Sequence, residues 1–506
     1  MSNDQQLNEL ARDVREQGLH QGGTMKDLVF DPVTGDFRQV ERGTSHGDGD
    51  VVTEMTDKGF AADTDRPVVC LWEDDLRKAE ETLAENEHPM GFAAGLDSGE
   101  GVYHLQLRAD DTDYSLLRSG KASLVPCVYT RDRNKISDED NSSVFRVLIT
   151  DSGPEVWCRP VPPSLRFQTC QPHKDEKYHW RKAEVMIIPS KDNLFSRSKG
   201  ILEVGILKDK RVMIVGLGSF GSRIAVELAQ AGVGSFSLVD FDRVEIHNLS
   251  RHIATIRDLG RLKTNVIEEA ILGKNPYARV DKFPVNINGD VQLLGDEVAK
   301  ADLVICATDN NASRYNLSAT LARTGKVGIY GRAFTRAEGG DVLIQRPGGP
   351  CYCCLVGGGN VQAEEITDEA SARRDGRIAA YVSPEDADAM VQVGLSSDIA
   401  PNCDMMVKLA LLELSRGRES GISCLEKELV HDYYIWANRR ERRFQNWKPM
   451  PEAGGMPTIL RWYGARIERD KDCPVCSGSV TLDGDDDTST DESLREQLKD
   501  TEIDLG

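Results

Sequence analysis

RVMIVGLGSFGSRIAVELAQAGVGSFSLVDFDRVEIHNLSR, residues 211–251, is the stretch of the chain that decides its fold. An apolar strand at 212–215 runs into a glycine-rich turn, an amphipathic helix follows, and a second apolar strand at 236–239 ends at Asp240. Glycines in such a turn let the backbone approach phosphates, the helix N-terminus favours negative charge, and the acid accepts hydrogen bonds from ribose hydroxyls. This βαβ unit predicts a nucleotide site whose phosphate-facing glycines are Gly216, Gly218 and Gly221.

Strands and helices continue to alternate after this unit. The sequence predicts helices at 263–273, 291–300, 312–324 and 402–414. It predicts strands between them at 280–285, 302–308 and 327–334. Such alternation is typical of a doubly wound, mainly parallel α/β sheet of the Rossmann type, which binds its ligand at the carboxyl ends of the strands.

The chain divides by composition into four regions. Residues 1–60 are polar and weakly patterned, which predicts a poorly ordered leader. Residues 61–189 contain short apolar runs between turn residues, which predicts a separate, mainly antiparallel N-terminal α+β domain of unknown role. A degenerate metalloprotease of the deubiquitinase type and a ubiquitin-conjugating fold both remain open for it. The nucleotide-binding fold occupies 190–478, and the acid-rich residues 479–506 predict a disordered tail.

Charge and hydropathy limit the possible partners and location. The net charge of −21 argues against a general nucleic-acid binder, because phosphate backbones require a basic surface. The sequence shows no apolar run near the ~18 residues of a membrane span and no signal-peptide pattern at its N-terminus. We therefore expect a cytoplasmic protein that binds neither nucleic acid nor membrane. In the cytoplasm, its 12 cysteines are expected to be buried thiols, metal ligands or a nucleophile rather than disulfides.

A second set of polar residues narrows the choice of nucleotide, since a glycine-rich turn alone also occurs in dehydrogenases. The set comprises Asp240, Asp242, Asn248 and Arg251 in DFDRVEIHNLSRH (240–252), Lys263 in GRLKTN and Asp309 in ATDNN. With ATP as ligand, Arg251 and Lys263 suit phosphates whose charge builds up as pyrophosphate leaves. Asp309 suits Mg²⁺, which prefers carboxylates and phosphate oxygens. Asn248 suits a phosphate or sugar oxygen.

Simpler roles for these residues remain open. Asp309 precedes a predicted helix and is also a good N-cap. Asp242 is equally suited to a structural turn, and the two cations to solvated helix surfaces.

Two cysteine pairs predict a metal site. Cys351 and Cys354 form one C-x-x-C pair, and Cys473 and Cys476 form the other. Four thiolates close a tetrahedral shell around Zn²⁺ with no open position, which is typical of a structural zinc. The long separation of the pairs predicts that the metal holds the end of the fold against its core. Cys353 is the odd neighbour, and the spacing favours Cys351 over it.

VGLGSFGS, DFDRVEIHNLSRH, the lysine of DLGRLKTN, CATDN, PCYCC and CPVC resemble, in this order, motifs of the ubiquitin-activating-enzyme superfamily of adenylyltransferases. That superfamily includes the enzymes that adenylate sulfur-carrier proteins for thiamine and molybdopterin synthesis. The resemblance covers about residues 192–476 and implies an ATP-dependent adenylation domain with a structural zinc. It also implies an ATP site formed by Asp240, Asn248, Arg251, Lys263 and Asp309.

The resemblance implies that ATP activates the C-terminal carboxylate of a small ubiquitin-like protein ending in glycine. AMP is transferred, pyrophosphate leaves, and the acyl group passes to a thiol on this chain or on a ubiquitin-conjugating-like partner. The appended N-terminal domain resembles the multidomain activating enzymes of bacterial antiviral conjugation operons. Because enzymes of this family pair two adenylation folds and one glycine loop is visible here, we expect a homodimer.

Three alternatives remain open. A sulfur-carrier-protein adenylyltransferase of cofactor biosynthesis would act without its own thioester. A non-catalytic scaffold would retain only a relic nucleotide fold. An oxidoreductase would use a dinucleotide, but neither ATDNN at a strand end nor four zinc thiolates is typical of that class.

Two further residues are weaker candidates. Cys403 lies between the cysteine pairs at the start of the predicted helix 402–414, where a helix N-terminus would lower a thiol pKa and favour a thioester-forming nucleophile. A packed, unreactive thiol is the alternative. Arg197 stands where the family's cross-subunit arginine would be, although its spacing to the glycine loop is short.

Overall fold

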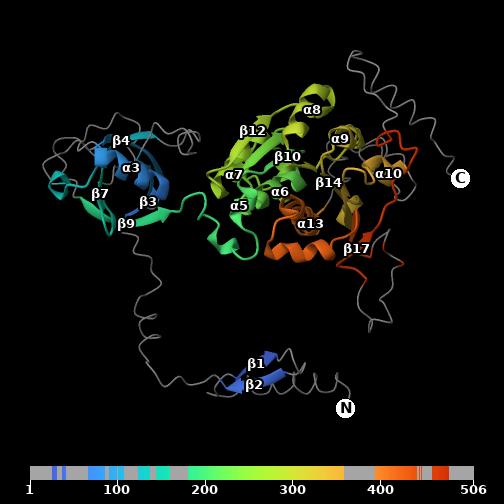
Figure 1. Cartoon of the computed structure of the whole chain (residues 1–506), viewed down its shortest axis with the longest axis horizontal. Coiled ribbons are helices and arrows are strands. Elements are labelled where there is room, and N and C mark those ends of the chain that lie inside the picture. The colour runs from blue at the N-terminus through green and yellow to red at the C-terminus, as the bar shows by residue number, and fades with distance from the viewer. Residues whose placement is uncertain are drawn as a thin grey trace. The chain divides into compact units, whose positions relative to one another are not determined.

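The computed structural model describes most of the chain between residues 67 and 477. The described residues are 26–30, 37–41, 67–85, 90–99, 101–107, 123–136, 144–159, 180–357, 394–440, 444, 446 and 458–477. They divide into two compact units, Met1–Asp65 and Arg66–Gly506. Figure 1 labels the elements of both units.

The first unit contains two antiparallel strands, β1 (Lys26–Phe30) and β2 (Phe37–Glu41). The sequence does not predict these strands within the leader. The rest of the predicted leader and the predicted acidic tail lie outside the described residues.

The second unit begins with a closed barrel in the strand order β3-β5-β4-β6-β7-β8-β9. Pairs β3–β5, β3–β9 and β6–β7 are parallel, and pairs β4–β5, β4–β6, β7–β8 and β8–β9 are antiparallel. A mainly antiparallel domain was predicted here, and closure into a barrel was not. Its strands are Val68–Trp72 (β3), Met90–Gly99 (β4), Val102–Gln106 (β5), Ser123–Thr130 (β6), Phe145–Thr150 (β7), Gly153–Cys158 (β8) and Arg181–Ile188 (β9).

One helix of the barrel region, α3 (Glu73–Glu85), follows β3 directly. Leu76, Ala79 and Leu83 recur at helical spacing along it and belong to the same buried cluster as Val69 and Leu71 of β3. The helix therefore forms part of the barrel's hydrophobic core.

The remainder of the second unit is organised around an eight-stranded sheet in the order β12-β11-β10-β13-β14-β15-β16-β17. Strands β10 to β14 pair in parallel, and β14 to β17 extend the sheet by antiparallel pairs. The predicted doubly wound α/β fold is confirmed. The strands are Arg211–Val215 (β10), Ser235–Val239 (β11), Arg279–Phe283 (β12), Leu303–Cys306 (β13), Gly328–Ala333 (β14), Gly339–Gln345 (β15), Tyr433–Ala437 (β16) and Arg461–Ala465 (β17).

Helices cover both faces of this sheet because side chains alternate along each strand. Val212 and Ile214 of β10 share a buried cluster with α6 (Ser219–Gln230), α7 (Lys263–Lys274) and α13 (Ser396–Ser415). Met213 and Val215 belong to another cluster, with α8 (Val291–Lys300) and α9 (Asn311–Thr324). Shorter helices are α5 (Val204–Leu207), α10 (Tyr352–Gly357), η1 (Arg133–Ile136), η3 (Ser196–Ser198), η4 (Ile246–Ser250), η5 (Ile256–Asp258), η6 (Ile287–Gly289), η7 (Thr335–Ala337) and η8 (Gly421–Lys427).

The predicted helices of the parallel half agree closely with the structure, and α13 is the exception. It begins at Ser396, six residues before the predicted start, and contains Pro401 in its second turn. A proline usually marks a helix start or a break, which explains why the sequence placed the boundary just after it.

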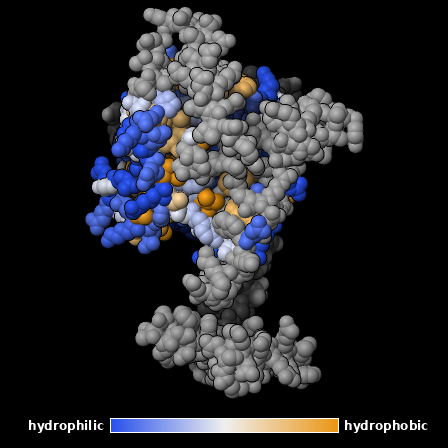
Figure 2. All heavy atoms as spheres, turned by 90° about the vertical axis from the view of Figure 1, so that its right-hand side faces the viewer, coloured by the Kyte–Doolittle hydropathy of each residue, from blue (hydrophilic) through white to orange (hydrophobic). Residues whose placement is uncertain are grey.

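On the side shown in Figure 2, hydrophilic residues cover much of the described surface and smaller hydrophobic patches lie between them. Among the described helices, none combines the length and the apolar character that a membrane crossing requires.

Candidate nucleotide pocket and metal centre

A cavity of about 500 Å³ opens at the carboxyl ends of the parallel strands, where it is lined by Val215, Val239 and Ala307. Strand β10 pairs with β11 on one side and with β13 on the other, so the loops that follow β10 and β13 diverge. Such a switch in strand order creates the crevice in which doubly wound folds bind ligands.

Most of the predicted nucleotide-binding residues meet in this cavity. Its lining includes Gly216, Gly218, Asp240, Asp242, Asn248, Arg251, Lys263 and Asp309. Gly221, Arg197 and Cys403 are not among the lining residues.

The three glycines of the turn have different tasks. Gly216 has a φ of +87°, and a Cβ there would lie 2.7 Å from the carbonyl oxygen of Ala307. A Cβ on Gly221 would lie 1.8 Å from the carbonyl oxygen of Gly216. Around Gly218 no atom would meet a Cβ within 4 Å, and this residue caps α6 without a side-chain hydrogen bond. The first and third glycines therefore allow close packing, while the second leaves the helix N-terminus open to an anion.

Leu217, inside this turn, is held from both sides. Its N–H donates to Asp240 Oδ2 (2.6 Å), and its carbonyl oxygen lies 2.8 Å from His252 Nε2. The N–H of Ala254 donates to His252 Nδ1 (2.9 Å), so the ring hydrogen is on Nε2 and donates to Leu217. Burial lowers the pKa of His252 and so favours this neutral form.

Asp240 therefore has a structural task besides the predicted one. Its Oδ1 also accepts from the N–H of Asp242 (2.8 Å), so both carboxylate oxygens orient backbone groups. Burial raises the pKa of Asp240, while the nearby charge of Lys263 and the two N–H groups oppose that shift.

Lys263 is the first residue of α7, and its side chain is almost completely buried at the edge of the cavity. Its Nζ lies 2.7 Å from Asp242 Oδ2. Asp242 therefore has a role beyond a turn: it holds the ammonium group in a site where an unpaired charge would be unfavourable. This pair keeps the lysine charge at the cavity wall.

Asn248 and Arg251 are presented by η4 (Ile246–Ser250). Asn248 Oδ1 accepts from the N–H of Glu245 (3.0 Å), which leaves its amide nitrogen as the group suited to donate into the cavity. The N–H of Arg251 donates to the carbonyl of Asn248, which ends η4 and brings the guanidinium side chain to the same wall.

Asp309 lies in the loop between β13 and α9 and is exposed in the cavity wall. It is not the N-cap of α9: Asn310 takes that position, and its Oδ1 accepts from the N–H of Ser313 (3.0 Å). Arg314 donates to the carbonyl of Thr308 and so supports the loop from beneath. The carboxylate of Asp309 is therefore not used for helix capping and is exposed in the cavity wall.

Two basic residues that also line the cavity, Arg332 and Arg336, were not predicted from the sequence. Arg332 in β14 is directly opposite Asp341 in β15, and its Nε donates to Asp341 Oδ1 (2.9 Å) in a buried ion pair. Tyr433 also donates to this carboxylate (2.7 Å). GRAFTRAE (331–338) contained the available signal, because one arginine lies inside the strand predicted at 327–334 and the other just after it. His252, within DFDRVEIHNLSRH, was not predicted to have a role.

Arg336 occupies a strained backbone conformation in this wall. Its φ is 60° and that of Ala337 is 49°, in the left-handed region that non-glycine residues seldom adopt. Asn438 Nδ2 donates to the carbonyl of Ala337 (2.9 Å), and Arg439 donates to the carbonyl of Arg336. Residues following β16 thus stabilise a turn that the local sequence would not favour.

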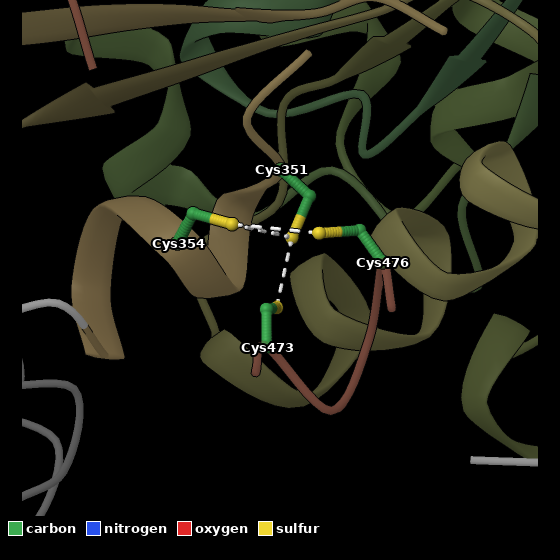
Figure 3. Close-up of side chains that lie close together, drawn as sticks. All are labelled: Cys351, Cys354, Cys473 and Cys476. Atoms are coloured by element: carbon green, nitrogen blue, oxygen red, sulfur yellow. Dashed lines mark hydrogen bonds between the residues drawn. The ribbon is translucent and has the colours of Figure 1, made fainter. Parts of the chain in front are cut away.

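The two C-x-x-C pairs meet in one cluster, as Figure 3 shows, and none of the four cysteines lines the cavity. The Sγ–Sγ distances are 3.6 Å between Cys351 and Cys354, and 3.5 Å for Cys351–Cys473 and for Cys354–Cys476. All four sulfur atoms lie within 4.8 Å of one another. Tetrahedral coordination with Zn–S bonds near 2.3 Å requires Sγ–Sγ separations of roughly 3.8 Å, so these residues fit Zn²⁺. Cys353 is buried beside them and is not one of the four.

Cys403 differs from its predicted setting. It lies inside α13, two turns after the helix begins, and is fully buried. Burial raises its pKa to about 12, so the thiol stays protonated at neutral pH. A protonated, inaccessible sulfur suits the packed-thiol alternative and not a nucleophile.

The chain is similar to known adenylyltransferases over this region. Residues 200–417 match the ThiF family. The molybdopterin-synthase adenylyltransferase of Escherichia coli is 39% identical over 151 residues, which are 29% of this chain and 59% of that protein. The sulfur carrier protein ThiS adenylyltransferase of the same organism is 35% identical over 181 residues, 35% of this chain and 66% of that protein.

A sulfur carrier protein adenylyltransferase of Thermus thermophilus is 34% identical over 155 residues, 29% of this chain and 56% of that protein. The chain thus covers less than two thirds of the curated relatives described here. The solved structure of E. coli MccB with ATP aligns with 54% of this chain and 69% of its own at 19% identity and a TM-score of 0.37, which is too remote to support a functional argument.

The residues of the ThiF match contain the glycine turn, the charged loops of the cavity and the first cysteine pair. Residues 200–417 thus match the ThiF family, and the chain is similar in part of its length to adenylyltransferases of sulfur-carrier proteins and of molybdopterin synthase.

Proposed function

We propose that this protein uses ATP to adenylate the C-terminal carboxylate of a small ubiquitin-like protein. The carboxylate oxygen attacks the α-phosphorus, the bond from that phosphorus to the bridging oxygen of pyrophosphate breaks, and pyrophosphate leaves with the electron pair. The convergence of the glycine turn, Arg251, Lys263 and Asp309 in one cavity carries this proposal. A volume of about 500 Å³ is within the usual range of small-molecule sites.

Each residue acts through its own chemistry. The N–H groups at the start of α6 hold phosphate oxygens, and Asp240 accepts from the ribose. Arg251 and Lys263 stabilise the negative charge that grows on the leaving pyrophosphate. Mg²⁺ bound through Asp309 would supply further neutralisation of phosphate charge. The four-cysteine centre would hold Zn²⁺ for a structural purpose.

An ATP–pyrophosphate exchange assay tests the proposal. Exchange should require both Mg²⁺ and a small protein ending in glycine, and Asp309→Ala should reduce it by about 10²-fold or more. Asp209→Ala is the matched control, since Asp209 is exposed and does not line the cavity. Equal exchange by Asp309→Ala and the wild type would contradict the assignment of Asp309. A complete absence of exchange would favour the relic scaffold.

The finer proposal is that the activated carboxylate passes to a ubiquitin-conjugating-like protein. The appended barrel region supports it by resemblance of domain order to conjugation enzymes. The named relatives instead favour the second candidate, a sulfur-carrier adenylyltransferase that forms no thioester of its own.

Incubation with ATP and candidate carriers distinguishes these two functions. On a non-reducing gel, an adduct of the carrier that disappears with thiol reductant indicates a thioester. Formation of the carrier adenylate alone indicates the second candidate function. Cys403→Ala should retain all adenylation, and any thioester as well. Loss of the thioester alone in this variant would restore Cys403 as the nucleophile.

We also propose a homodimer in which Arg197 of one protomer reaches the cavity of its partner. Within a single chain Arg197 does not line the cavity, which is compatible with that role. Mass measurement by light scattering tests the dimer. Mixing Arg197→Ala with Asp309→Ala protomers tests complementation: exchange should recover toward one wild-type site per mixed dimer, and no recovery would exclude a cross-subunit role.

A further inference from the structure

Tyr352 lies between the two cysteines of the first pair, and its side chain belongs to a buried hydrophobic cluster of the core. It is fully buried, and its ring stacks on that of Tyr330 with a centroid separation of 5.4 Å. The ring of Tyr315 packs edge-on at 5.4 Å. A residue of the metal-binding turn therefore has a single, well-packed position.

The hydroxyl of Tyr352 connects this turn to the nucleotide cavity. The hydroxyl donates to Asn311 Oδ1 (2.7 Å), and Arg332 Nη1 lies 3.5 Å from the tyrosine hydroxyl oxygen. Asn311 is the first residue of α9, two residues after Asp309, and Arg332 lines the cavity. One hydroxyl thus contacts both the start of α9, next to the loop that carries Asp309, and Arg332 of the cavity wall.

The ring reinforces this connection. The guanidinium carbons of Arg314 and Arg332 lie 5.9 Å and 5.8 Å from its centroid, within the range of cation–π attraction. Arg314 also donates to the carbonyl of Thr308, next to Asp309. The Tyr352 side chain therefore lies against groups that hold the Asp309 loop and the Arg332 wall.

A backbone contact secures the turn to the same helix. The N–H of Tyr352 donates to Ser318 Oγ (3.2 Å) in the middle of α9, and Ser318 Oγ donates to Gln345 Oε1 (2.8 Å) at the end of β15. The cysteine turn is consequently attached to α9 at two points, of which the hydroxyl is the one that reaches the cavity.

We propose that Tyr352 is a positioning residue that couples the metal centre to the nucleotide pocket, so that metal and nucleotide each strengthen the binding of the other. This inference rests on the proposed adenylation function. Metal bound by Cys351 and Cys354 restrains the backbone on both sides of Tyr352, and the hydroxyl then holds Asn311 and Arg332 where the cavity needs them. Binding free energies are reciprocal, so the effect must be measurable from both sites.

The first measurement is nucleotide affinity, made by calorimetry with Mg²⁺ and a non-hydrolysable ATP analogue. Tyr352→Phe keeps the ring and removes the hydroxyl, and we expect its affinity to fall about 5- to 10-fold, at the lower end of usual coupling strengths. Tyr330→Phe is the matched control, because this buried hydroxyl bonds to Gln345 and contacts no cavity residue in the described contacts. Equal losses in both variants would indicate a general packing effect and overturn the proposal.

The second measurement is the rate of metal release to a chromogenic chelator. In the wild type the ATP analogue should slow release several-fold, and in Tyr352→Phe it should have little effect, although the variant binds one metal per chain. An equal slowing in both proteins overturns the coupling through Tyr352. A wild-type chain that lacks metal also overturns it, while carrier-dependent pyrophosphate exchange by that chain would leave the proposed function standing. A wild type that binds metal and no nucleotide contradicts both.

Discussion

The charged residues of the cavity differ in how far they are buried and paired within the protein. Lys263 is almost completely buried and paired with Asp242 at 2.7 Å, whereas Asp309 is exposed in the cavity wall. A buried, held cation requires no reorganisation when phosphate charge develops, which makes its stabilisation effective.

Lys263→Ala should therefore reduce pyrophosphate exchange by about 10²- to 10³-fold, with a smaller effect on the overall fold. Lys282→Ala is the matched control: its ammonium group also contacts a carboxylate, Glu268 Oε2 at 2.6 Å, but does not line the cavity. Steady-state exchange rates at saturating ATP measure both. If the two variants lose activity equally, Lys263 has no special role in the reaction.

His252 predicts a specific dependence of stability on pH. Burial lowers its folded-state pKa below the ordinary value near 6.5, so the unfolded chain binds this proton more readily than the folded chain. The free energy of unfolding should consequently fall as pH decreases from about 6.5 through the window down to the lowered pKa.

His252→Gln should make that decline shallower, because glutamine does not titrate. Urea unfolding from pH 7.5 to pH 5 measures it, and His247→Gln, at an exposed position beside Glu245, is the control. A wild-type slope that persists in His252→Gln would show that other groups produce it.

At the scale of elements, the glycine turn contains one position required for close packing and another that is open to a ligand. A Cβ at position 221 would lie 1.8 Å from a backbone oxygen, but a Cβ at 218 would meet nothing within 4 Å. The two positions therefore allow a matched pair of substitutions in one turn.

Gly221→Ala should lower stability by about 1–3 kcal/mol, the usual cost of overpacking. Gly218→Ala should leave the unfolding midpoint almost unchanged and weaken nucleotide binding, because its methyl group would occupy the phosphate side of the turn. Thermal unfolding and analogue binding measure the two effects. The reverse ranking in stability would contradict the packing assigned to the turn.

The sequence predicted the parallel half of the sheet well because each element there has a strong local signal. Helix α8 was predicted with its observed bounds, Val291–Lys300, since apolar periodicity and a preceding turn coincide. Closure of the barrel and the antiparallel strands β15 to β17 depend on pairings between distant segments, which no local pattern specifies.

The candidate site was predictable to a similar extent. Acids and cations that follow strands within recognised motifs were found, and their convergence in one cavity agrees with the predicted binding set. Arg332 was missed because its importance arises from Asp341 across the sheet, and Cys403 was misplaced because Pro401 concealed the start of α13. Burial, which keeps the Cys403 thiol protonated, cannot be read from spacing.

At the scale of the whole molecule, the metal centre should control the integrity of the adenylation fold. We expect about one Zn²⁺ per chain by elemental analysis, because four sulfur atoms form a closed tetrahedral set. Cys473→Ser should lose the metal and lower the unfolding midpoint, and Cys424→Ser, at an exposed cysteine outside the cluster, should do neither. A metal-free protein with the stability of the wild type would contradict a structural role.

The cysteine cluster joins two segments that are far apart in the sequence. Cys351 and Cys473 are 122 residues apart, and a metal between them closes that segment into a ring. The entropy of closing a flexible ring grows slowly with its length, about 0.6 kcal/mol for each doubling. The wide separation of the two cysteine pairs is therefore only a small entropic cost for the metal centre. The ring encloses α13, β16 and β17, so a single metal ion restrains the segment that completes the sheet and covers one of its faces.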